Sequence, residues 1–259
     1  MKPILLTLIL SASVGIGAAQ TPAAVERELV SYADNITKYG TYAGSYDGEK
    51  LEKNNDSLRN ALIKYGKRAD VLQYNFPKLD HKVYIATSRD GRLRIYSWDL
   101  GSGGSLHDFD NVYQYRGKSG KVYSWTAKQE VESGGSFYTH IFQTETLQGP
   151  IYLGVSTSIG DTSLNGQSIE GFRIDGERLD TKAKVIRTGS GPTNSVGFLY
   201  DFFSVVDHPE RPIRLFFYDD AKKSFRFPIV IEDSKTPQGR VTNRYITYRF
   251  DGKYFVKVG

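Results

Sequence analysis

The residues with the clearest chemical potential occur in two series that repeat the same order. Each series contains Tyr-Ser-Trp, then Ser-Gly-Gly-Ser, and then a histidine, which is His107 in the first and His140 in the second. Both tryptophans of the chain and two of its four histidines lie inside these series. A turn-forming pair precedes each Tyr-Ser-Trp, so residues 82–107 and 111–140 are predicted to form two similar hairpin units.

The histidines raise the question of acid-base catalysis, because imidazole titrates near neutral pH and can activate a hydroxyl. Ser105 precedes His107 and Ser136 precedes His140, so each series offers a nucleophile and a base for a hydrolase. The chain contains no Gly-x-Ser-x-Gly or His-Glu-x-x-His motif, and no acid is placed by spacing to orient either histidine. Ordinary hydrogen-bonding histidines at strand ends are the favoured interpretation.

Three oxygen-bearing side chains near His107 are candidates for a calcium site, namely Asp108, Asp110 and Asn111. An EF-hand loop needs more oxygen ligands at regular spacing, and that pattern is missing. The chain has no cysteine, which excludes disulfides, a thiolate nucleophile and a thiolate zinc site. The Ser-Gly-Gly-Ser segments lack the Lys-Ser or Lys-Thr ending of a phosphate-binding loop. We therefore expect neither a metal nor a cofactor.

The aromatic residues of the two series predict a ligand-binding surface. Side chains alternate between the two faces of a strand, so each series is expected to place one cation, one tyrosine and one tryptophan on a single face. These six residues are Arg94, Tyr96, Trp98, Lys121, Tyr123 and Trp125. Two such stripes side by side would form a flat surface for sugar rings or an anionic ligand. The alternative, which burial statistics favour, is that this face packs beneath the N-terminal helices.

Residues 20–76 are predicted to form a helical segment. An N-cap followed by Pro22 begins the first helix, apolar residues recur at helical spacing, and Gly40 ends it. Glu26, near the start, would favour the positive end of the helix dipole.

A second helix is predicted to complete a helical hairpin. Its cap is expected at Asp56 or Ser57, and Gly66 marks its end.

Residues 82–259 are predicted to form an antiparallel β domain, because apolar and polar residues alternate there between turns. The turns are expected at Asp90-Gly91, Ser119-Gly120, Gly149-Pro150, Asp175-Gly176, Asp219-Asp220 and Asp251-Gly252. The predicted fold class is mainly β, with the helical hairpin packed on a long meander that forms a sandwich or barrel. A small β-propeller is the alternative. Segments 187–197, 208–212 and 233–243 are predicted to interrupt the sheet.

Residues 1–19 have the three parts of a secretory signal peptide: a positive start, an apolar run and small residues before the cleavage point. We therefore expect a bacterial periplasmic or secreted protein, with no membrane span after signal removal.

The chain has a formal charge of +5. From Thr181 onward 14 Lys and Arg stand against 8 Asp and Glu. A solvated surface is the favoured interpretation of this basic third. If it binds a partner, we expect an acidic protein or an anionic envelope polymer, since export makes nucleic acid an unexpected one.

Three functional hypotheses follow. The first is a soluble, non-catalytic binding protein of the cell envelope that acts on another envelope or secreted protein, as an inhibitor, immunity or assembly factor. It is favoured because no catalytic constellation is complete and several hairpin loops are available for contacts. The second is a glycan-binding module that uses the Tyr and Trp face. The third is a hydrolase that uses His107 or His140.

Overall fold

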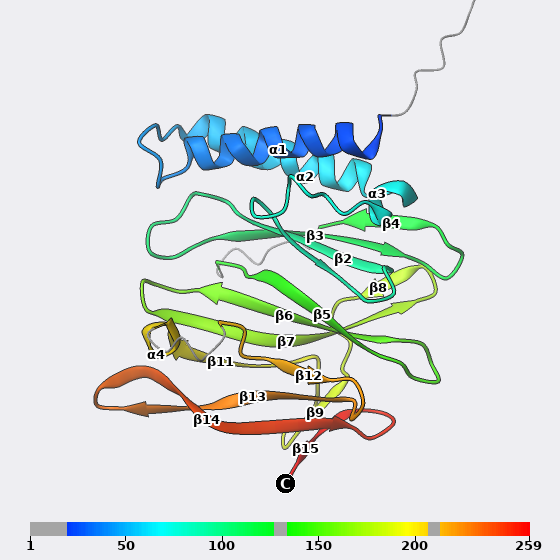
Figure 1. Ribbon diagram of the computed structural model, residues 1–259, viewed down its shortest axis with the longest axis vertical. Helices are drawn as coiled ribbons and strands as arrows, with labels where there is room; N and C mark the ends of the chain where they lie inside the picture. The colour runs from blue at the N-terminus through cyan, green and yellow to red at the C-terminus, as the bar shows by residue number, and fades with distance from the viewer. Residues whose placement is uncertain (1–19, 127–133, 207–212) are drawn as a thin grey trace, which may run out of the picture.

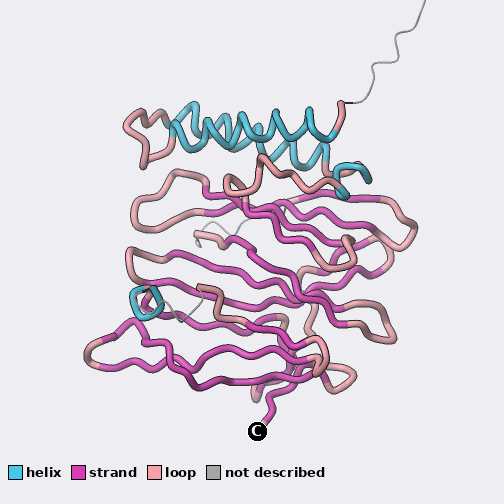
Figure 2. The backbone as a smooth tube through the Cα atoms, viewed as in Figure 1, coloured by secondary structure: helices cyan, strands magenta, loops and turns pink. Residues whose placement is uncertain are grey.

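The computed structural model describes residues 20–126, 134–206 and 213–259. The predicted signal peptide and the segment at 208–212 lie outside the described residues. In the described part, one layer of helices and three β-sheets are stacked on one another (Figure 1). The helical pair gathers at one end of the stack, and strands fill most of the remainder (Figure 2). These features confirm a mainly β protein with an N-terminal helical hairpin packed on antiparallel sheets.

The first helix begins and ends where the sequence predicts. It is α1 (Pro22–Tyr39), and the side chain of Thr21 accepts the N–H of Ala24 at 3.3 Å. The buried face carries Val25, Leu29 and Ile36, at the spacing of an amphipathic helix.

The second helix begins earlier than predicted. It is α2 (Gly48–Tyr65), and its cap is Asp47, which accepts the N–H of Lys50 at 3.1 Å. The expected start at Asp56 or Ser57 was wrong, because Asp47 already satisfies a free N–H and the additional turns bury Leu51 and Asn55. A short third helix, α3 (Ala69–Gln73), follows and was not predicted.

The first sheet contains both Tyr-Ser-Trp segments and is a four-stranded antiparallel meander with strands in chain order. Its strands are β1 (Tyr84–Thr87), β2 (Leu93–Asp99), β3 (Phe109–Arg116) and β4 (Val122–Trp125). The two series therefore form successive hairpins in one sheet as far as the second tryptophan. Beyond it they differ, because the second histidine lies in a strand of the next sheet.

The second sheet has the order β11-β7-β6-β5, with β8 paired to the end of β7. These strands are β5 (Phe137–Thr144), β6 (Ile151–Ile159), β7 (Leu164–Asp175), β8 (Arg178–Asp180) and β11 (Ser195–Asp201). A short helix, α4 (Phe203–Val206), follows β11.

The third sheet has the order β10-β9-β15-β14-β13-β12. Its strands are β9 (Ile186–Thr188), β10 (Gly191–Thr193), β12 (Phe217–Asp219), β13 (Ser224–Asp233), β14 (Thr236–Phe250) and β15 (Phe255–Val258). The β15–β9 pair is parallel. The predicted interruptions at 187–197 and 233–243 were wrong, because pairing with neighbouring strands outweighs the low β propensity of Gly and Ser.

Three apolar layers hold the stack together. The first lies between the helices and the first sheet and includes Trp98. The second lies between the first and second sheets and includes Tyr113 and Phe172. The third lies between the second and third sheets and includes Phe225 and Phe255. The sheets stack face to face, so the sandwich form of the prediction is the one observed, and the described strands close no barrel.

All six predicted turns lie at the ends of neighbouring strands or between them. Among the described residues, none of the helices has the length and apolar character needed to cross a membrane.

Candidate functional site

The first predicted aromatic stripe lies under the helices. Trp98 is 1% exposed and Tyr96 is fully buried. Trp98 Nε1 donates to Asn55 Oδ1 of α2 at 2.9 Å, and the Tyr96 hydroxyl donates to Gln114 Oε1 at 2.8 Å. Arg94, on the same face, donates to a backbone carbonyl just beyond α3 at 2.8 Å. These three side chains join the helices to the sheet and leave no surface for a ligand.

The second predicted stripe lies on the opposite face of the same sheet, so the expected single surface of two adjacent stripes was wrong. Trp98 pairs with Asp110 on β3, whereas Trp125 pairs with Tyr113. These β3 partners are three positions apart, and an odd step along a strand reverses the face. Trp125 therefore faces the second sheet, where it stacks on Tyr113 with ring centroids 5.2 Å apart.

Trp125 is only partly buried, and it lines a cavity of about 920 Å³. We call this cavity the aromatic–basic cleft. Its lining combines aromatic, cationic and acidic side chains with parts of two turns. The lining residues are Tyr115, Trp125, Gln148, Pro150, Arg173, Ile174, Asp175, Arg178, Leu179, Asp180, Thr181 and Lys182.

One wall of the aromatic–basic cleft is fastened to the first sheet through Glu177, in the β7–β8 turn. Its carboxylate accepts the hydroxyl of Tyr123 at 2.8 Å and both the N–H and the hydroxyl of Ser119. These donors, led by the Ser119 N–H, lower the pKa of Glu177. Lys121, also predicted to contact a ligand, lies over the Tyr123 ring at 5.2 Å. Tyr123 and Lys121 thus lie beside the wall of the cleft and are absent from its lining.

His107 has the orienting acid that sequence reasoning did not find. Its Nδ1 lies 2.5 Å from Asp99 Oδ2, and its Nε2 lies 3.0 Å from the Tyr42 hydroxyl. Tyr42 also stacks on the imidazole, with ring centroids 5.2 Å apart. The acid ends β2 and comes eight positions before the histidine. The short distance in sequence between Asp99 and His107 could have suggested the pair, but only the conformation of the connecting loop directs the carboxylate toward Nδ1.

A pocket of about 370 Å³ adjoins His107 and is lined in part by Ser105, Tyr42 and Asn165. The two ring nitrogens of the histidine lie against Asp99 and Tyr42, and no hydrogen bond to Ser105 is present among the described residues. The structure therefore brings together an acid, a base and a phenol, and it leaves the serine unactivated. A nucleophilic triad needs the serine within hydrogen-bond reach of the base.

His140 lies in β5 of the second sheet, apart from His107. His140 is exposed, but neighbouring groups partly desolvate its ring, and this desolvation, followed by the nearby Arg214 cation, lowers its pKa from 6.5. The folded chain therefore binds this proton less readily than the unfolded chain. The resulting contribution to stability is present above pH 6.5 and is lost as pH falls through the lowered pKa.

We expect an NMR titration of the His140 ring to give a midpoint below 6.5. Arg214→Gln should raise that midpoint part of the way, since desolvation of the ring remains. Arg173→Gln serves as the control, because this arginine lies in the aromatic–basic cleft, and it should leave the midpoint unchanged. A His140 midpoint at or above the ordinary value would contradict the expectation.

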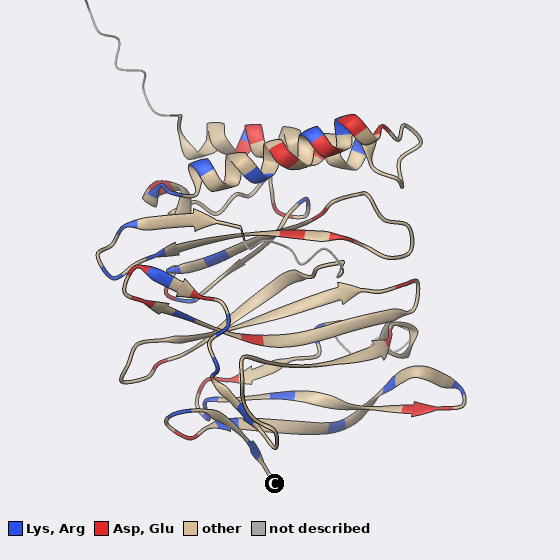
Figure 3. Ribbon diagram, turned by 180° about the vertical axis from the view of Figure 1, so that it is seen from behind, with Lys and Arg blue, Asp and Glu red and all other residues tan. Residues whose placement is uncertain are grey.

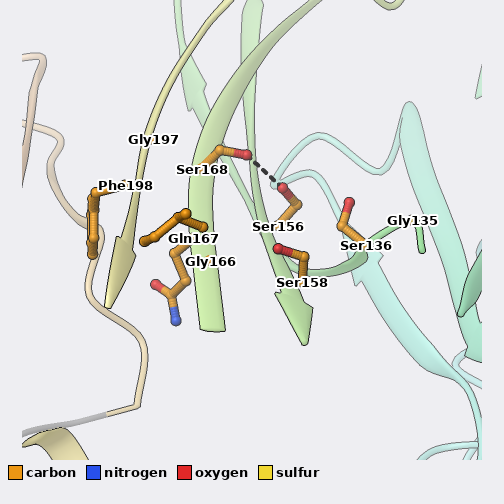
Figure 4. A pocket seen from close by; sticks show the side chains of 10 residues that line it. Gly135, Ser136, Ser156, Ser158, Gly166, Gln167, Ser168, Gly197 and Phe198 are labelled. Atoms are coloured by element: carbon orange, nitrogen blue, oxygen red, sulfur yellow. Dashed lines mark hydrogen bonds between the residues drawn. The ribbon is translucent and has the colours of Figure 1, made fainter. Parts of the chain in front are cut away.

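Ser136 lines a third cavity, a groove of about 500 Å³ with a floor formed by small residues of the second sheet. Figure 4 shows Ser156 and Ser168 facing each other, and their hydroxyl oxygens are 2.8 Å apart. Next to them, Glu170 accepts the Ser156 hydroxyl and the Tyr138 hydroxyl, each at 2.8 Å. Among the described residues that line this groove there is no histidine.

Two tyrosines buried between the first and second sheets keep their protons. Burial raises the pKa of Tyr113 to about 12. Burial and the neighbouring Tyr113 and Glu170 raise the pKa of Tyr138 well above its ordinary value. Both phenols are therefore neutral at physiological pH, and that of Tyr138 donates to Glu170.

The three residues predicted to bind calcium each contact a different partner. Asp110 is 3% exposed and forms an ion pair with Arg59 of α2, with Nε and Oδ2 2.5 Å apart. Asp108 accepts the hydroxyl of Ser102 at 3.1 Å, and Asn111 donates to the Ser136 carbonyl at 3.0 Å. The described residues contain no cluster of three or more His, Asp or Glu that could hold a metal ion.

Comparisons with protein-family models, with curated proteins and with solved structures found no match to this chain.

Proposed function

We propose that this chain is an exported, non-catalytic binding protein of the bacterial periplasm or exterior. Its partner is another envelope or secreted protein, which it engages as an inhibitor, immunity or assembly factor. The contact surface in this proposal is the outer face of the third sheet, at the end of the stack opposite the helices. Two aromatic rings and three arginines on that face are the observation that supports the proposal.

Strand register defines this surface. Phe217 pairs with Arg226, which pairs with Thr247, so the three share a face. Their neighbours Phe225 and Tyr248 point the other way, into the third apolar layer. We call the surface the outer face. Its central residues are Arg187, Phe217, Arg226, Tyr245, Thr247, Arg249, Val256 and Val258.

The outer face is basic and partly apolar. Arg187, Arg226 and Arg249 are exposed, and none forms an ion pair within the part of the chain that the structure describes. Arg226 lies over the Tyr245 ring at 4.8 Å, and that tyrosine is 43% exposed. Figure 3 shows Lys and Arg distributed along the strands of the third sheet.

This composition fits a protein partner with a complementary acidic patch. Tyrosine and arginine are enriched among the residues that dominate binding energy at protein interfaces. A sheet face also holds these side chains on a rigid support, which lowers the entropy lost on binding. The basic charge would speed encounter with an acidic partner.

Site-specific cross-linking tests the proposal. A photoreactive amino acid at Thr247, in the middle of the outer face, should cross-link one protein in envelope extracts of the producing organism. The same probe at Glu52, which lies on the helical layer at the opposite end of the stack, is the matched control and should cross-link none.

Charge reversal by Arg226→Glu in the Thr247 probe protein should remove that cross-linked product, because the new charge repels an acidic partner. Arg173→Glu reverses charge in the aromatic–basic cleft and should leave it intact. Equal cross-linking from both probe positions, or none from Thr247, would argue against the outer face as the contact surface.

A further inference from the structure

The aromatic–basic cleft is a second, separate site with its own ligand chemistry. We propose that it binds an oligosaccharide whose sugar units carry carboxylate groups. This inference does not depend on a protein partner at the outer face, because the two surfaces share no residues. A volume of about 920 Å³ accommodates several sugar units and lies within the usual range for ligand sites, about 300–1,000 Å³.

The aromatic side of the cleft provides the surface for sugar rings. One side of the Trp125 indole is covered by Tyr113, and the tryptophan remains partly exposed where it lines the cleft. Tyr115 lies beside it and is held by its stack on Tyr123, with ring centroids 5.3 Å apart. A rigid aromatic surface next to polar groups suits the apolar C–H face of a pyranose ring.

The charged side of the cleft provides the groups for carboxylates. Arg173 is half-buried, Arg178 and Lys182 are exposed, and none of the three forms an ion pair among the described residues. An arginine can hold a carboxylate through two parallel N–H bonds, and such charge-assisted bonds are stronger than neutral ones.

Two acids in the lining disfavour a densely charged anion and tolerate an anion that also carries hydroxyl groups. Asp180 stands opposite Arg173 in the β7–β8 hairpin, and Asp175 stands opposite Arg178. Three cations and two acids leave the lining with a small positive charge. A dense polyanion such as polyphosphate would be repelled by both acids. A saccharide with one carboxylate per sugar unit also carries hydroxyl groups, which would donate to these acids.

The cleft is also preorganised. The Tyr115 hydroxyl donates to the backbone carbonyl of Glu177 at 3.1 Å, so the floor and the β7–β8 wall are joined. Next to this contact, a Cβ at Gly117 would lie 2.3 Å from the Glu177 carboxylate, so a larger residue there would have to displace that carboxylate. Groups held in place before binding lose little entropy when the ligand arrives.

Isothermal titration calorimetry on the full mature chain tests the assignment. The acidic probes are oligogalacturonate and peptidoglycan glycan strands, and the comparison probes are a neutral maltooligosaccharide of equal length and polyphosphate. We expect at least one acidic saccharide to bind at least about tenfold more tightly than either comparison probe, as one charge-assisted hydrogen bond would provide.

Two variants locate the site. Arg173→Gln should weaken binding of the acidic saccharide at least about tenfold. Arg226→Gln, an equal loss of charge on the outer face, should not change it. In the wild type, ligand should alter tryptophan emission, and Trp125→Phe, which leaves only the buried Trp98, should abolish that response.

Three results would each overturn the assignment: no binding of either acidic saccharide, equal binding of the neutral oligosaccharide, or equal losses from the two arginine variants. Cross-linking through Thr247 would be unaffected by any of them, so failure of this site is distinguishable from failure of the proposed protein partner.

Discussion

Replacing Trp98 with alanine is expected to lower the free energy of unfolding by about 3–5 kcal/mol, the usual range for removing a fully buried large aromatic residue. Trp98 is 1% exposed and belongs to the apolar layer that joins the helices to the first sheet. Its loss leaves a cavity in that layer. It also removes the donor to Asn55 Oδ1, so a buried acceptor loses the 2.9 Å hydrogen bond that satisfies it.

Urea unfolding followed by far-ultraviolet circular dichroism measures this effect without relying on tryptophan emission. Trp98→Phe retains most of the buried volume and should cost clearly less than the alanine variant. Trp125→Ala is the matched control, since the second tryptophan is only partly buried. Equal losses at the two tryptophan positions would show that Trp98 does not carry the helix–sheet contact.

Replacing Glu26 with alanine is expected to cost about 2–3 kcal/mol, because the buried N–H of Leu79 loses its acceptor, at about 1–3 kcal/mol, and the part-buried Tyr74 hydroxyl and Lys78 N–H lose theirs as well. Glu26 is 2% exposed. Its carboxylate accepts the Tyr74 hydroxyl at 2.9 Å and the backbone N–H groups of Lys78 and Leu79 at 2.6 and 3.2 Å. This acid therefore holds the segment between α3 and β1 against α1.

Thermal and urea unfolding of Glu26→Ala and Glu26→Gln test that arrangement. Glutamine keeps an acceptor oxygen of similar shape, so the Gln variant should recover most of the lost stability. Glu28→Ala offers a comparison on the same helix, since among the described residues its carboxylate accepts only the hydroxyls of Tyr32 and Tyr65. If the three variants lost the same stability, the buried network around Glu26 would not be the cause.

Local sequence features identified most elements of the fold. These features act over a few residues. The proline near the start of α1 and the turn pairs of the sheets mark observed boundaries, and the apolar spacing of α1 marks its buried face. The start of α2 was misplaced because Asp47 and Asp56 are equally plausible caps, and only the burial of Leu51 and Asn55 favours the earlier one. Glu26 was predicted to act on the helix dipole, yet its partners lie some fifty positions away.

The candidate sites depended much more on tertiary structure. Trp125 was predicted to contact a ligand, but most residues that line the cleft with it come from β7, β8 and the segment beyond them. Arg173, Arg178 and Lys182 had no motif that could have marked them. Asp99 was close to His107 in sequence, and it remained unrecognised because the conformation of the intervening loop sets its direction.

The doubled series shows where the division lies. By itself the sequence determined that Tyr96-Ser97-Trp98 and Tyr123-Ser124-Trp125 form strands of two hairpins, because alternation and turn residues act over a few positions. Only the tertiary structure decided that Trp98 packs under helices while Trp125 opens into a cleft. The reason is register: a shift of one residue in strand pairing reverses every side chain, and no local signal specifies that shift.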